Sequence, residues 1–174
     1  TSVQSLSDSA SYASSAAVMA SPAFRRHLAD GKDLLVHGFG ADRRTFTANQ
    51  PALSAVADVW SLDLPGHGAS PWTEGMAPSA AAFADAIRRA IDDAGVDRVD
   101  MVGHSLGGAV SGVFAARYPD RVRSLTALAA SGLGRPVPRV FVETLPTLTD
   151  VEATEHLLQR LFVRKSLANR RLAL

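Results

Sequence analysis

From Lys32 onward, short apolar runs alternate along the chain with stretches of helical periodicity. The runs are rich in Val and Leu and are typical of strands buried on both faces. We predict strands at residues 33–37, 59–64, 99–103 and 122–130. Because strands that alternate with helices usually pair in parallel through right-handed crossovers, the pattern predicts an α/β fold in which helices flank a parallel sheet.

Two amphipathic stretches predict the helices between these strands. Residues 78–95 repeat apolar side chains every three or four positions, with Ser79 as a candidate N-cap and Gly95 as a stop signal. Residues 106–118 form the second stretch, which Pro119 closes.

The chain divides into three segments by its composition and its hydrophobic periodicity. Residues 1–31 are rich in Ser and Ala without a lasting period, and we expect a weakly structured lead-in. Residues 32–134 hold the alternating strands and helices. Residues 135–174 begin with a proline-punctuated stretch and continue as an amphipathic helical segment, in which Thr149 and Glu152 have the spacing of a capping box.

Charge and composition narrow the classes of partner. Lys and Arg number 18 against 17 Asp and Glu, so the net charge of +1 gives no electrostatic reason to expect nucleic acid or an anionic membrane. The absence of cysteine excludes thiolate catalysis, disulfides and cysteine-ligated metal sites. No apolar run reaches the length of about 18 residues that a membrane span needs. We therefore expect a cytoplasmic protein with neither a nucleic-acid nor a membrane partner.

The strongest candidate for chemistry is the sequence Gly103-His104-Ser105-Leu106-Gly107, which has the pattern G-x-S-x-G. A predicted strand precedes it and a predicted helix follows, which is the context of a nucleophilic serine on a sharp turn. Gly103 and Gly107 leave room for this turn, because a Cβ at either position would collide with neighbouring elements. The alternative is a glycine-rich turn with an incidental serine.

A second glycine-rich loop, His37-Gly38-Phe39-Gly40, follows the first predicted strand. The Phe39 amide in this loop and the Leu106 amide, at a positive helix N-terminus, are the expected donors of an oxyanion hole. Gly38 and Gly40 let the main chain approach a substrate oxygen closely. We expect the side chain of His37 to anchor the loop rather than to transfer protons.

Four stretches of the chain resemble the α/β-hydrolase superfamily, in its branch of esterases and C–C hydrolases: LVHGFG, DLPGHGAS, MVGHSLGGAV and AARYPDRVRSLTALAASGLG. The last stretch and the helical residues after it are also similar to the hydrolase-like acyltransferase subunit of acetoin dehydrogenase complexes. The resemblance implies Ser105 as the nucleophile and the amides of Phe39 and Leu106 as the oxyanion hole. It also implies residues 135–174 as a cap over a pocket for a small acyl substrate.

The resemblance excludes some chemistry as well. Haloalkane dehalogenases and epoxide hydrolases of this fold carry an aspartate at the position of Ser105, so we do not expect their reactions. Residues 63–70 match a loop that has a structural role near the pocket, and His67 within it receives no catalytic role.

The chain departs from the family in the residues that would complete a catalytic triad. In this fold the acid and the histidine follow the serine along the chain. Only His156 follows Ser105, and its place on an amphipathic helix indicates a surface histidine. We therefore expect a sheet that is cut at both margins and a chain that ends before the catalytic acid and histidine.

The resemblance also predicts the order of the strands across the sheet, namely 59–64, 33–37, 99–103 and 122–130. Both outer strands would then expose an apolar edge, and unpaired edges favour association with other chains. Self-association through these edges is the expected partnership besides the small substrate.

The predicted function is a serine hydrolase that acts on an ester, thioester or related carbonyl through an acyl-serine intermediate, without a metal or organic cofactor. An acyltransferase subunit of an acetoin dehydrogenase-like complex is one alternative, and it would pass the acyl group to a thiol instead of water. A catalytically incomplete binding protein that retains a pocket is the other. Because a serine hydroxyl without a general base is a poor nucleophile, we expect the isolated chain to be inactive toward simple esters.

Overall fold

The computed structural model describes residues 32–134 and 136–160, and the predicted lead-in at residues 1–31 lies outside them. Four parallel strands form one sheet in the order β2-β1-β3-β4. The strands are β1 (Lys32–Val36), β2 (Asp58–Leu62), β3 (Val99–His104) and β4 (Val122–Leu128). The predicted strand order and the predicted parallel α/β fold are both confirmed.

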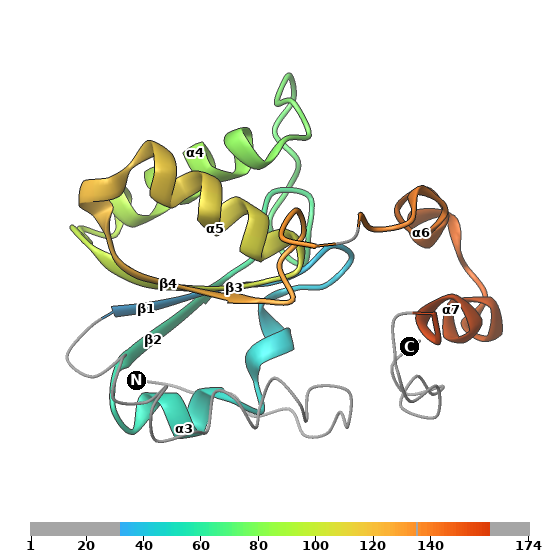
Figure 1. Cartoon of the computed structure of the whole chain (residues 1–174), viewed down its shortest axis with the longest axis horizontal. Coiled ribbons are helices and arrows are strands. Elements are labelled where there is room, and N and C mark those ends of the chain that lie inside the picture. The colour runs from blue at the N-terminus through green and yellow to red at the C-terminus, as the bar shows by residue number, and fades with distance from the viewer. Residues whose placement is uncertain (1–31, 135, 161–174) are drawn as a thin grey trace.

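Helices cover the two faces of this sheet (Figure 1). α4 (Ala80–Asp93) and α5 (Leu106–Arg117) lie on one face, and the short α3 (Gln50–Ser54) lies on the other. After β4 the chain forms α6 (Arg139–Thr144) and α7 (Val151–Leu158), which lie beside the sheet. Three 3-10 turns join these elements: η2 (Arg43–Phe46), η3 (Pro119–Arg121) and η4 (Leu145–Thr147). No helix in the described ranges is long and apolar enough to cross a membrane.

The central strand β1 contributes to two hydrophobic clusters because its side chains alternate between the faces of the sheet. Leu34 and Val36 pack in the larger cluster, which the buried side chains of α4 and α5 complete. Leu35 packs on the opposite face with Phe46 and Leu53. The two clusters fix β1 from both sides, and the loop that follows this strand therefore begins at a rigid position.

The helix caps confirm one prediction and correct another. Ser79 caps α4 as predicted, and its hydroxyl accepts a hydrogen bond from the Ala82 amide at 3.1 Å. The predicted capping box at Thr149 is wrong, because Asp150 is the N-cap of α7. The Asp150 carboxylate accepts from the amides of Glu152 and Ala153, at 3.3 and 2.9 Å. A carboxylate has two oxygens for two amides and a negative charge at the positive end of the helix, and a threonine hydroxyl offers neither.

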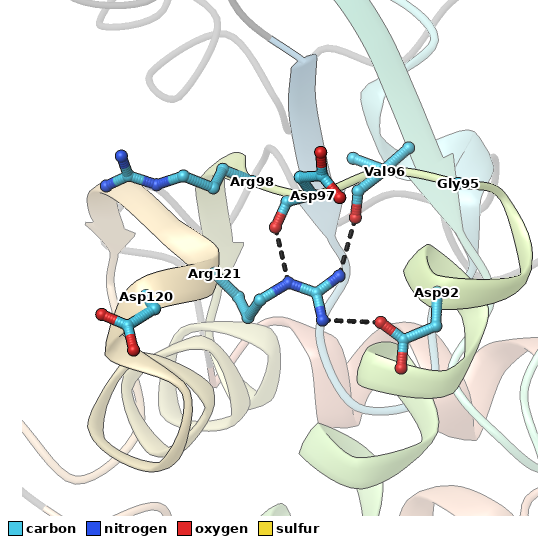
Figure 2. Close-up of a pocket in the computed structure, with 7 residues that line it drawn as sticks. All are labelled: Asp92, Gly95, Val96, Asp97, Arg98, Asp120 and Arg121. Carbon is cyan, nitrogen blue, oxygen red and sulfur yellow. Dashed lines mark hydrogen bonds and ion pairs between the residues drawn. The ribbon is translucent and has the colours of Figure 1, made fainter.

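At the end of the sheet where β3 begins, Arg121 ties η3 to the turn between α4 and β3 (Figure 2). Its guanidinium donates to the carbonyl oxygens of Val96 and Asp97, at 2.7 and 2.5 Å, and pairs with Asp92 at 2.6 Å. These residues line a cavity of about 460 Å³. Ser105 follows the other end of β3, so this cavity is separate from the predicted site.

Candidate functional site

Ser105 lies on the sharp turn between β3 and α5, with φ 52° and ψ −115°. A positive φ is unusual for a residue other than glycine and stores backbone strain, which is typical of functional sites. Two main-chain hydrogen bonds of 3.0 Å hold the turn, one from the Ser105 amide to Leu128 O and one from the Ser131 amide to Ser105 O. The predicted strand–turn–helix placement of Ser105 is therefore confirmed.

The glycines on both sides of this turn are required by close main-chain contacts. A Cβ at Gly103 would lie 2.4 Å from Gly107 O, and a Cβ at Gly107 would lie 2.1 Å from Val36 O. Real Cβ atoms essentially never approach backbone oxygens so closely. The start of α5 is thus packed directly on the end of β1, which confirms the steric prediction for Gly103 and Gly107.

Ser105 opens into a cavity of about 410 Å³, a volume within the usual range for small-molecule sites. Phe39 lines it from the loop after β1, and His104 and Leu106 line it from the turn. The cavity therefore brings together the three residues that the sequence predicts as nucleophile and oxyanion donors. A further wall comes from residues in and just before α6, namely Val137, Phe141 and Val142, which lie within the segment that the sequence predicts as a cap.

The chemical character of the cavity is apolar. Its described lining contains no Asp, Glu, Lys or Arg, and the polar side chains besides His104 and Ser105 are the hydroxyls of Thr45 and Ser131. A cavity of this kind favours an uncharged group of a ligand.

Phe39 and Leu106 line the cavity, and their amides are the predicted oxyanion donors. Within the described residues, neither amide donates a hydrogen bond to the protein. An amide already bonded to a backbone carbonyl could not serve an oxyanion. The joint action of the two amides on one substrate oxygen stays a prediction. Gly38 allows the close approach of the loop to Ser105, because a Cβ at Gly38 would lie 3.2 Å from the Ser105 Cβ.

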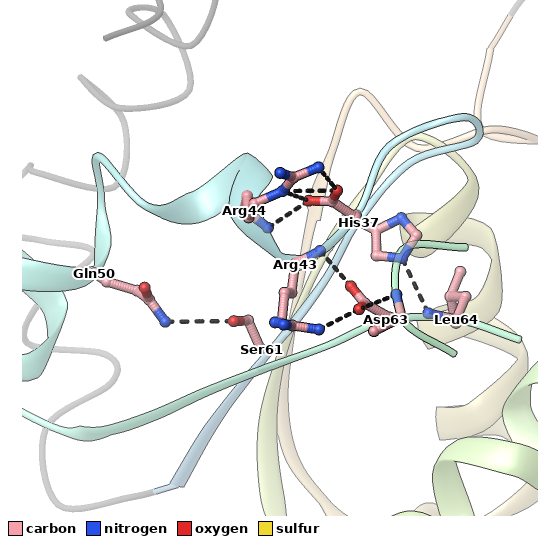
Figure 3. A network of polar contacts seen from close by, with 9 residues as sticks. His37, Arg43, Arg44, Gln50, Ser61, Asp63 and Leu64 are labelled. Atoms are coloured by element: carbon pink, nitrogen blue, oxygen red, sulfur yellow. Dashed lines mark hydrogen bonds and ion pairs between the residues drawn. The ribbon is translucent and has the colours of Figure 1, made fainter. Parts of the chain in front are cut away.

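His37 anchors the loop that carries Phe39. Its fully buried ring donates from Nδ1 to Gly38 O at 2.8 Å. Its Nε2 accepts from the Leu64 amide at 3.0 Å (Figure 3). One ring nitrogen donates and the other accepts, so the imidazole is neutral. Burial lowers the pKa of His37 in the same sense. The predicted structural role of this histidine is confirmed.

Asp63, at the end of β2, holds the neighbouring loop in place (Figure 3). Its carboxylate accepts from the amides of Arg43 and Ala69, at 2.7 and 2.9 Å, and forms an ion pair with the Arg43 guanidinium. Burial alone would raise the pKa of Asp63, but the two amides and the guanidinium outweigh it and lower the pKa below its ordinary value. The structural role predicted for this loop is consistent with these contacts.

The described residues do not supply Ser105 with a base through a hydrogen bond. No hydrogen bond joins the Ser105 hydroxyl to a histidine within them. His104 lines the cavity, but its Nδ1 is buried without a partner, and burial lowers its pKa. His156 is exposed on α7, as predicted. Across the described ranges, no group of three or more His, Asp or Glu side chains is arranged to hold a metal ion.

Comparison with known proteins identifies the family. The family model described as "alpha/beta hydrolase fold" matches residues 34–164. The chain belongs to the α/β-hydrolase family. The match to the family model continues past residue 134, so the segment with α6 and α7 lies within the matched region.

Two curated relatives differ in the reaction that their names state. The chain is 32% identical over 139 residues to the dihydrolipoyllysine-residue acetyltransferase component of the acetoin cleaving system of Pseudomonas putida, a match that covers 80% of the chain and 37% of the relative. It is 45% identical over 94 residues to a pimeloyl-acyl-carrier-protein methyl ester esterase of Neisseria meningitidis, which covers 54% of the chain and 28% of the relative. The α/β-hydrolase chain thus matches less than half the length of each.

Solved structures show the same fold. The meta-cleavage product hydrolase of Pseudomonas fluorescens IP01 superposes with a TM-score of 0.73 at 24% identity, over 84% of this chain and 55% of that one. A marine microorganism esterase superposes with a TM-score of 0.62 at 22% identity, over 82% of this chain and 58% of that one. The α/β-hydrolase described here therefore spans about half the length of these solved hydrolases.

Proposed function

We propose that this α/β-hydrolase acts on an ester or thioester through an acyl-serine intermediate at Ser105. The observation that supports the proposal most is the strained turn of Ser105, which opens into an apolar cavity that Phe39 and Leu106 also line. The cavity has room for an uncharged acyl group, and two unused amides border it.

In the proposed reaction, the Ser105 Oγ bonds to the substrate carbonyl carbon and loses its proton to a base. The carbonyl oxygen becomes an oxyanion, which the amides of Phe39 and Leu106 stabilise at the positive N-terminus of α5. The leaving alkoxide or thiolate departs with a proton, and the acyl group stays on Oγ. Water then attacks the acyl-serine and releases the acid.

The reaction needs a general base, and within the described residues no base is hydrogen-bonded to the Ser105 hydroxyl. Free imidazole, a small molecule that fits a cavity of about 410 Å³, can take its place in an experiment. We expect imidazole to accelerate the labelling of Ser105 by a p-nitrophenyl alkylphosphonate, with release of p-nitrophenolate and a phosphonyl group detected by mass spectrometry on the peptide that contains Ser105.

Two variants of cavity serines provide the matched comparison. Ser105→Ala removes the proposed nucleophile and sets the background reaction of imidazole with the probe. Ser131→Ala removes a hydroxyl from the lining of the same cavity and should label like the wild-type chain. Labelling that is equal in the wild-type chain and in Ser105→Ala, with or without imidazole, would refute the proposed nucleophile. Saturable binding of the probe without labelling would instead favour a binding protein that retains the pocket.

Transfer to a thiol is the second candidate function. It is favoured by the match to the acetyltransferase component, which covers 80% of the chain against 54% for the esterase. Hydrolysis and transfer share the acyl-serine and differ only in the acceptor. If transfer is the reaction, dihydrolipoamide or coenzyme A added to the acylated chain forms a thioester faster than water releases the acid, and the ratio of the two products distinguishes the functions.

A further inference from the structure

The loop between β2 and α4 holds His67 in a fixed orientation. The His67 amide donates to Leu64 O, and the Ser70 amide donates to His67 O, both at 2.9 Å. The imidazole donates from Nδ1 to Pro65 O at 3.1 Å. Main chain and side chain are therefore both tied to the same short loop, and the ring has little freedom to turn.

Three rings surround this imidazole. Ring centroids lie 5.1 Å away at His37, 6.1 Å at Phe39 and 6.4 Å at Phe83. Phe83 is buried in the large hydrophobic cluster and supports the imidazole from the core side. The other two rings belong to the loop that carries the candidate oxyanion amide. His67 thus lies between the core and both side chains of this loop.

We propose that His67 is a positioning residue, whose ring fixes the Phe39 side chain and through it the direction of the Phe39 amide. The inference rests on the function proposed at Ser105. Gly38 and Gly40 flank Phe39 and have no side chains that could hold the main chain here, and Gly40 has a φ of +69°. Within the described residues the Phe39 N–H makes no hydrogen bond. The carbonyl of the same peptide, Gly38 O, accepts from His37 Nδ1 at 2.8 Å and from the Ala41 amide at 3.3 Å. The support that His67 adds to this peptide therefore comes from its contacts with the rings of His37 and Phe39.

The expected effect on rate follows from the geometry of an oxyanion hole. Loss of one donor reduces turnover by roughly 100-fold to 1000-fold, and a misplacement of about 1 Å reduces it by roughly 100-fold. A donor that has lost only its side-chain support keeps part of its effect. We therefore expect a loss of about tenfold when the ring of His67 is removed.

A matched pair of variants separates the ring from the hydrogen bond. His67→Phe keeps an aromatic ring and loses the Nδ1 donor to Pro65. His67→Asn keeps an N–H donor at a similar position and loses the ring. Trp72→Ala is the control, because Trp72 contacts Phe83 at a centroid distance of 6.3 Å but is 45% exposed and far less involved in the core.

Two readouts are measured on the full chain. The first is the amide resonances of Phe39 and Leu106 in ¹H–¹⁵N spectra, which do not depend on activity. The second is the rate of Ser105 labelling by the alkylphosphonate in imidazole, resolved into the saturation constant of the probe and the maximal rate. Thermal unfolding by circular dichroism establishes that each variant is folded, and His67→Leu replaces His67→Asn if the latter does not fold.

We expect His67→Asn to shift the Phe39 amide, leave the Leu106 amide in place and lower the maximal labelling rate about tenfold at an unchanged saturation constant. His67→Phe and Trp72→Ala should stay within about twofold of the wild-type rate. The proposal is overturned if His67→Asn changes neither readout, or if His67→Phe changes both as much as His67→Asn does. A Phe39 shift without labelling of the wild-type chain supports the positioning role and refutes the function at Ser105. Equal labelling of the wild-type chain and all variants would support the function at Ser105 and refute the positioning role of His67.

Discussion

Replacement of Asp33 by asparagine should stabilise the protein at neutral and alkaline pH. Asp33 is fully buried in β1, and neither carboxylate oxygen has a hydrogen-bond partner in the described part of the chain. Burial is the main cause that raises its pKa from 3.8 to about 7, and the neighbouring carboxylate of Asp100, its register partner on β3, adds to the effect. Asp100 itself is satisfied by Arg123 and by Ser124, whose hydroxyl donates to it at 2.6 Å.

The sign of the pH dependence follows from this raised pKa. Between pH 4 and 7 the folded chain retains a proton on Asp33 that the unfolded chain has lost, so the free energy of unfolding falls as the pH rises. The interval from 3.8 to about 7 spans roughly three pH units, and each corresponds to about 1.4 kcal/mol. Ionisation of Asp33 thus costs at most about 4 kcal/mol, and this cost is complete above pH 7.

Urea unfolding at pH 4.5, 6 and 8 measures the effect. The free energies of unfolding of Asp33→Asn and the wild-type chain should differ by under about 1 kcal/mol at pH 4.5, and the variant should gain stability progressively toward pH 8. Asp93→Asn is the control, since Asp93 is exposed at the end of α4. Parallel pH profiles for Asp33→Asn and the wild-type chain, or a less stable Asp33→Asn at pH 8, would show that ionisation of the buried Asp33 carboxylate does not destabilise the folded chain.

Three further substitutions test the site and its supports. Gly107→Ala should destabilise the chain by several kcal/mol in urea unfolding, because its Cβ would meet Val36 O at 2.1 Å; an unchanged midpoint would contradict the packing of α5 on β1. Asp63→Asn should cost roughly 2 kcal/mol at pH 7, and this loss should shrink as the pH falls below 3.8, because the lowered pKa makes the stability from this carboxylate disappear as the pH falls through it; a loss that does not change with pH would refute the charged role. Phe141→Ala should weaken binding of a long-chain alkylphosphonate more than that of the methyl analogue, as measured by the saturation constants, and equal changes for both probes would exclude α6 from the acyl wall.

The sequence contains enough local information to predict the turn at Ser105. Gly103 and Gly107 stand at fixed spacing around the serine, an apolar run precedes them, and the two signals act within a few residues of each other. The same holds for Ser79 as the cap of α4. At the start of α7 the local pattern led to the wrong N-cap, Thr149. Asp150 is the adjacent candidate, and its carboxylate is the better acceptor for two amides.

The parts of the site that could not be predicted depend on contacts between distant residues. Phe141 lies in the segment expected to cap the pocket, but it shares the cavity with Phe39 across about a hundred positions, and no periodicity in a six-residue helix singles it out. The burial of Asp33 is similar: a charged residue near the start of an apolar run is typical of a solvated strand end, and only the assembled sheet covers it. Gly108 is a third case, since a Cβ there would lie 2.4 Å from the Cβ of Ala130, which follows β4.

The contact between Gly107 and the carbonyl of Val36 has a consequence for redesign of the protein. Because backbone meets backbone there, the spacing between the start of α5 and the end of β1 is set by main-chain contacts. Libraries directed at α6 can therefore vary the cavity wall formed by Val137, Phe141 and Val142 while the packing of α5 on β1, the frame of the site, stays constant. Insertions between β1 and Phe39 or between β3 and α5 would instead alter the frame itself, and selections for new substrates should leave both segments untouched.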